Sequence, residues 1–101
     1  MPRGIHLIER SGRIQKIEGS VHESGFWDVT LQTAQELVGG EIYFHKKQKE
    51  PSFFGGKIVG YRIHDGDDEY HGRIIFRFES SREHRNVSAG AGGWSYEKKI
   101  V

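Results

Sequence analysis

The side chains best suited to binding chemistry lie in one loop, between two segments of alternating apolar residues. This loop carries four basic side chains and two adjacent aromatic ones, namely His45, Lys46, Lys47, Lys49, Phe53 and Phe54. Lysines neutralise phosphates, and aromatic rings stack on unpaired bases. The loop therefore predicts a nucleic-acid contact in which Phe53 or Phe54 stacks on a base. The alternative is that the lysines solvate an edge strand and one phenylalanine plugs the core.

Two tryptophans and their neighbours form a second group of candidates. Trp27 lies between Phe26 and Asp28, and Trp94 follows a glycine-rich stretch. Recognition of a base needs a flat aromatic wall and a polar group that reads the base edge. Asp28 or Thr30 could supply that polar group. The alternative is that Trp27 is a buried core residue.

The segment "REHRNVSAGAGGW", residues 82–94, combines Arg82 and Arg85 with a glycine-rich loop. Glycines allow close backbone approach, and their N–H groups can hold a phosphate. The "GK[ST]" ending of a P-loop is missing. The segment is therefore either a phosphate contact or a plain flexible connection.

Catalytic and metal-binding patterns are absent from the sequence. Cysteine is missing, the histidines do not form H-E-x-x-H, and no serine lies in G-x-S-x-G. The acidic segment "HDGDDEYH", residues 64–71, lacks the twelve-residue calcium pattern. We predict a protein that is not an enzyme and binds no metal or cofactor.

The composition suits one small domain of 101 residues with a net charge of only +1. Attraction for nucleic acid must therefore come from a local patch. Residues 41–62 carry five lysines or arginines against two glutamates, a net charge of +3. Residues 65–69 carry a net charge of −4, which predicts that this acidic turn lies away from the site.

The sequence predicts a cytoplasmic protein without a membrane contact. No apolar run approaches the roughly 20 residues of a membrane span. The first ten residues, "MPRGIHLIER", lack the apolar segment of a signal peptide.

Apolar alternation predicts about six short strands and one short helix. "GIHLIER" and "RIQKIEGSVH", joined at Ser11-Gly12, predict a hairpin within residues 1–24. Thr33, with Glu36 three residues later, predicts a capping box for a helix that ends at Gly39-Gly40 and buries Ala34, Leu37 and Val38. Residues 25–81 form the predicted core of the single domain, and residues 82–101 the glycine-rich loop and the last strand.

The order of strand, short helix, "ELVGGEIYFH", loop and "GGKIVGYRI" resembles the PUA-like superfamily, which includes PUA, ASCH, EVE and YTH domains. The resemblance covers about Gly25 to Phe78, and Gly40-Glu41 stands where members often have Gly-Asp. It implies a small mixed β-barrel that holds RNA, or a modified base flipped out of a duplex, in an aromatic pocket. Trp27 lies in the segment where EVE-like domains carry a pocket tryptophan, and Trp94 would close the pocket.

Together these observations predict a mostly β, PUA-like mixed barrel that binds RNA or modified DNA. The predicted stacking residues are Trp27, Trp94, Phe53 and Phe54, and the predicted base-edge readers are Asp28 and Thr30. The predicted phosphate contacts are His45, Lys46, Lys47, Lys49, Arg82 and Arg85. The alternative is a protein-interaction module, such as an inhibitor or accessory subunit of a larger enzyme, which does not bind nucleic acid.

Overall fold

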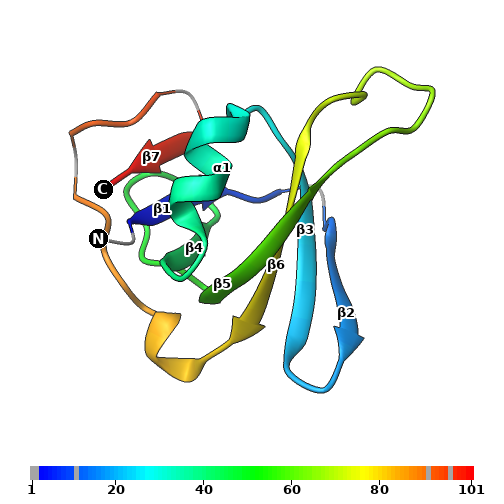
Figure 1. The fold of residues 1–101 in the computed structure, drawn as a ribbon. Coiled ribbons are helices and arrows are strands. Elements are labelled where there is room, and N and C mark those ends of the chain that lie inside the picture. The colour runs from blue at the N-terminus through cyan, green and yellow to red at the C-terminus, as the bar shows by residue number, and fades with distance from the viewer. Residues whose placement is uncertain (1–2, 11, 91, 96) are drawn as a thin grey trace.

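A computed structural model of the chain describes residues 3–10, 12–90, 92–95 and 97–101, and these build a mostly β fold around one mixed sheet (Figure 1). The strands are β1 (Gly4–Ile8), β2 (Ile14–Glu18), β3 (Val21–Trp27), β4 (Glu41–His45), β5 (Phe54–Ile63), β6 (Ile74–Ser80) and β7 (Lys98–Ile100). The helix α1 (Leu31–Leu37) follows β3, and the 3-10 turn η1 (Arg82–His84) follows β6. The predicted mostly β class with a short helix is confirmed, with seven strands rather than about six in the described residues.

The strand order is β2-β3-β6-β5-β4-β1-β7, and β1 runs parallel to β4. The predicted hairpin within residues 1–24 is therefore wrong, because β1 pairs with β4 and β7 while β2 pairs with β3. Ser11 of the predicted turn lies outside the described residues. All five residues of β1 are buried, as expected for a strand covered on both faces, whereas four of the five in β2 are exposed.

The core is built from side chains of five strands, β1, β3, β4, β5 and β6, together with the helix α1. Its largest fully buried side chains include Phe44 of β4 and Phe76 and Phe78 of β6. The helix contributes Ala34 and Leu37 to this core, as predicted, but Val38 is 39% exposed. The helix ends at Leu37, and the following Gly39 has a φ of 89°, a left-handed conformation that favours glycine.

The helix begins two residues before the predicted capping box. Thr30 is the N-cap, and its Oγ1 accepts a hydrogen bond from the backbone N–H of Thr33 at 3.1 Å. The same hydroxyl donates to Thr33 Oγ1 at 2.9 Å. Thr33 therefore lies inside the first turn, where Thr30 satisfies its N–H.

Candidate functional site

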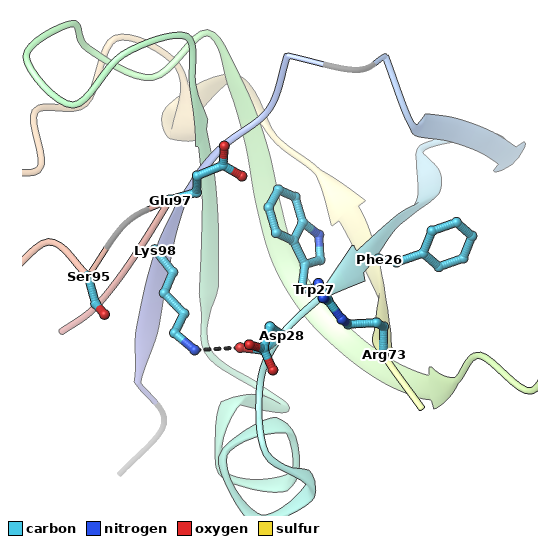
Figure 2. Close-up of a pocket in the computed structure, with 7 residues that line it drawn as sticks. All are labelled: Phe26, Trp27, Asp28, Arg73, Ser95, Glu97 and Lys98. Carbon is cyan, nitrogen blue, oxygen red and sulfur yellow. Dashed lines mark hydrogen bonds between the residues drawn. The ribbon is translucent and has the colours of Figure 1, made fainter. Parts of the chain in front are cut away.

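A pocket of about 510 Å³ opens where β3 ends. Its lining comes from three segments, and consists of Phe26, Trp27, Asp28, Arg73, Ser95, Glu97 and Lys98. Figure 2 shows Glu97 and Lys98 facing Trp27 and Arg73 across the pocket, with Asp28 between them. The Lys98 ammonium donates a hydrogen bond to the backbone oxygen of Asp28. The predicted pair Trp27 and Asp28 thus lies in one pocket.

Trp27 is mainly a core residue. It is 8% exposed, and its indole Nε1 donates to Ser24 Oγ at 3.0 Å. The alternative that placed Trp27 in the core is confirmed, and only a small part of its ring faces the pocket. Stacking of Trp27 on a base stays a prediction.

Opposite charges alternate around this pocket. Asp28 and Glu97 supply carboxylates, and Arg73 and Lys98 supply cations. Carboxylates accept hydrogen bonds, whereas guanidinium and ammonium groups only donate them. The lining therefore suits a flat polar ligand that carries both donors and acceptors, such as a nucleobase.

Phe26 is the centre of an aromatic cluster beside the pocket. Its ring stacks on Tyr70 with centroids 5.0 Å apart and lies 4.2 Å from the ring of His64. The Arg13 guanidinium lies 4.5 Å from the Tyr70 ring centroid, and its Nη2 donates to Tyr70 Oη at 3.1 Å. The sequence analysis did not identify four residues of this region, namely Arg13, Tyr70, Arg73 and Lys98. Their residue types were the only sign of a role in the site, because each lies far from Trp27 in sequence.

None of the five residues of the acidic turn lines the pocket, and its predicted separation from the site stays a prediction. Tyr70 follows the turn directly and stacks on Phe26, which lines the pocket. This contact holds the β5–β6 connection against the end of β3. One carboxylate of the turn is engaged, since Asp68 accepts from the Tyr70 N–H at 2.9 Å and lies 3.1 Å from His64 Nε2. The hydrogen bond with His64 lowers the pKa of Asp68.

The basic loop joins β4 to β5, and its three lysines are exposed. The Lys46 ammonium lies 4.9 Å from the Phe53 ring centroid, and Lys47 pairs with Glu50 at 3.9 Å. His45 is fully buried, and its two ring nitrogens lie 2.8 Å from His6 Nδ1 and 2.8 Å from the backbone oxygen of Glu50. The prediction that His45 contacts a phosphate is therefore wrong, because neither nitrogen reaches the surface.

The predicted arginines lie beside the basic loop. Ser52 of the loop donates from Oγ to the backbone oxygen of His84 at 2.6 Å, and Asn86 N–H donates to the Ser52 backbone oxygen at 2.6 Å. These bonds tie the segment that carries Arg82 and Arg85 to the loop. Both arginines are exposed, so the structure brings together cations that lie more than thirty residues apart in sequence.

The remaining predicted aromatic side chains contact other parts of the protein and do not line the pocket. Phe53 and Phe54 are partly buried and pack against the core, and the Arg85 guanidinium lies 5.5 Å from the Phe54 ring centroid. Trp94 donates from Nε1 to the Gly90 backbone oxygen at 3.2 Å. Its ring meets His45 edge-on at 5.7 Å, so it covers the buried histidines instead of closing the pocket.

Thr30 is the cap of α1 and does not line the pocket. We expect Thr30→Ala to lower the free energy of unfolding by about 1 kcal/mol, the usual loss for a helix N-cap. Urea unfolding of the two proteins measures this difference. The variant should bind ligand in the pocket as the original chain does, and a selective loss of binding at unchanged stability would instead restore Thr30 as a base-edge reader.

The described residues contain no group of three His, Cys, Asp or Glu side chains arranged to hold a metal ion. Within those same residues, no helix has the length and apolar character needed to cross a membrane. Comparison of the chain with family models, curated proteins and solved structures found no match.

Proposed function

We propose that this protein is a non-catalytic nucleic-acid-binding module, and that the pocket at the end of β3 takes an unpaired or modified base. The observation that carries the proposal is that Trp27 and Asp28 share this pocket with Arg73 and Lys98. A volume of about 510 Å³ lies within the range of small-molecule sites. An aromatic wall with a few convergent polar groups is what recognition of a flipped base requires.

A curled sheet supports the PUA-like barrel that we propose as the fold. In the strand order, β7 is an edge strand and β3 is next to the opposite edge. The Lys98 side chain at the start of β7 nevertheless donates to the Asp28 backbone oxygen just after β3. The two sides of the sheet therefore approach each other at the pocket, as they do in a barrel that is nearly closed.

The exposed cations of the basic loop are the proposed contacts for the nucleic-acid backbone. Glu9 and Arg10, which lead from β1 toward β2, connect the loop to the pocket region. Glu9 N–H donates to the His45 backbone oxygen at 2.9 Å, and Arg10 Nε donates to the Lys46 backbone oxygen at 3.3 Å. Both residues also line a smaller hollow that shares Trp27 with the pocket. A strand bound in the pocket can thus reach the lysines.

The test uses Trp94→Phe, which leaves Trp27 as the only tryptophan. It is titrated with short single-stranded RNA and DNA, and with duplexes that do or do not contain 5-methylcytosine, at two salt concentrations. We expect a salt-sensitive change of Trp27 fluorescence with one of these ligands. Replacing Lys46, Lys47 and Lys49 by alanine should reduce the slope of log affinity against log salt by about 2, since each phosphate contact to a single strand contributes about 0.7.

Asp28→Asn tests the pocket itself, because it replaces an acceptor by a group that also donates. We expect about tenfold weaker binding. The matched control is Glu79→Gln, an exposed carboxylate in the part of β6 that pairs with Val21 rather than with Trp27. Absence of binding to every ligand at low salt would overturn the proposal. It would favour the protein-interaction alternative, for which the exposed Val38 and Val59 are candidate contacts.

A further inference from the structure

We infer that the pocket is one end of a track for a single strand of about three nucleotides, which passes around Phe26 and is held by Arg73 and Arg13. The inference rests on the proposed function and extends it from one base to a strand and its phosphates. Its starting point is that Phe26 lines three separate hollows of the surface. The track is defined as these three hollows together.

Shared lining residues show that the hollows adjoin one another. The first is the pocket of about 510 Å³, and the second, of about 260 Å³, shares Phe26, Trp27, Arg73 and Glu97 with it. The third, of about 310 Å³, shares Gly25, Phe26 and Arg13 with the second. A ligand that leaves the pocket along the surface therefore passes Arg73 first and Arg13 next.

Aromatic rings and cations both line this path. Trp27 borders the first and second hollows, Phe26 borders all three, and Tyr70 borders the second. Arg73 lies where the first hollow meets the second, and Arg13 lies where the second meets the third. Proteins that bind single strands combine stacking rings with backbone-tracking cations in this way, without reading the sequence.

Both guanidinium groups keep donors for a phosphate. Arg13 donates from Nη2 to Tyr70 Oη at 3.1 Å, and a guanidinium carries five N–H donors. The Arg73 guanidinium lies 5.9 Å from the Tyr70 ring centroid, on the same aromatic platform. Tyr70 thus positions two cations at the two junctions of the track, where the phosphates between successive bases would lie.

The main carboxylate of the third hollow is already neutralised. Glu23 accepts from Arg62 at 3.1 Å and from Arg77 at 3.1 Å. Burial alone raises the pKa of Glu23, but hydrogen bonds from the two arginines outweigh it and lower the pKa overall. The group of three carries a net charge of +1 around neutral pH, so this end of the track does not repel a phosphate.

The experiment measures the affinity of the chain for oligonucleotides of one to five nucleotides, by isothermal titration calorimetry at low salt. We expect affinity to rise with each of the first three nucleotides. Arg13→Ala should weaken binding of the trinucleotide about tenfold and leave the mononucleotide unchanged, because the first hollow does not contain Arg13. Lys16→Ala, at an exposed cation of β2 that lines none of the three hollows, is the matched control.

Arg13→Lys keeps the charge but not the planar fork, so it should recover part of the lost affinity. This second variant separates a phosphate contact from loss of the Phe26 and Tyr70 stack, and thermal unfolding of both variants verifies that the fold is retained. If Arg13→Ala and Lys16→Ala have equal effects at every length, the inferred track is contradicted, whereas the proposed base pocket is not. If no oligonucleotide binds at any length, both the track and the proposed function are contradicted.

Discussion

Replacing Gly40 by alanine is expected to lower the free energy of unfolding by about 3 to 5 kcal/mol. A Cβ atom at this position would lie 1.6 Å from the backbone oxygen of Arg3, where no atom fits. The same oxygen accepts a hydrogen bond from Glu41 N–H at 3.0 Å, next to the first pair of the β1–β4 ladder, Gly4 with Glu41. The clash is with backbone, so relief requires β1 to move away from β4.

That movement is costly because β1 is buried along its whole length and paired with β4 on one side and β7 on the other. Ile5 and Leu7 are each 0% exposed to solvent, and both belong to the core. The matched control is Gly60→Ala in β5, where an added Cβ would meet nothing within 4 Å. The control should leave stability unchanged or raise it by up to about 1 kcal/mol. Equal urea midpoints for the two variants would show that close approach of β1 to β4 is not required.

The strands and the helix could be predicted from local sequence patterns, whereas the pairing of the strands could not. The alternation in β4, β5 and β6 and the glycine after α1 are properties of neighbouring residues, and these elements were predicted. Ile5 and Leu7 alternate in the same way whether their strand enters a hairpin or a parallel pair. The choice depends on which strands pair with the two edges of β1, and these partners, β4 and β7, come from distant parts of the chain.

In the candidate site, too, residues that are neighbours in sequence could be predicted, whereas residues brought together by the fold could not. Trp27 and Asp28 are adjacent in sequence, so the pocket could be predicted around them. Arg73 and Lys98 reach it only because β3 pairs with β6 and the curled sheet brings β7 beside the end of β3. His45 was misassigned because alternation places it on the outer face of its strand. Nothing local shows that Trp94 covers that face.

The buried histidines make a second large effect testable, a loss of stability in mild acid. His6 is 4% exposed and its ring stacks on Tyr43 with centroids 4.5 Å apart. Its Nδ1 lies 2.8 Å from His45 Nε2. His45 Nδ1 faces the backbone oxygen of Glu50, which can only accept, so this nitrogen carries the proton and Nε2 accepts from His6. Burial, followed by the charges of His45 and Lys99, lowers the pKa of His6 from 6.5 to about 4.

Because the pKa of His6 is lower in the folded protein, the unfolded chain binds one more proton between pH 6.5 and about 4. The free energy of unfolding therefore falls as the pH falls through this window, by at most about 1.4 kcal/mol per pH unit. We expect His6 to account for a loss of about 2 kcal/mol between pH 7 and pH 4.5. Staying above pH 4.5 limits the contribution of Glu23 and Asp68, whose lowered pKa values make their own losses appear at lower pH.

Urea unfolding at pH 7 and pH 4.5 is compared for the original chain, His6→Asn and His71→Asn. Asparagine can still donate to His45 but does not titrate, so His6→Asn should lose about 2 kcal/mol less than the original chain on acidification. His71 is an exposed histidine on the β5–β6 connection, and its replacement is the matched control. The readout is the difference between two pH values within each protein, so any uniform loss of stability from the substitution cancels. An unaltered pH dependence in His6→Asn would show that burial of this histidine does not govern the response to acid.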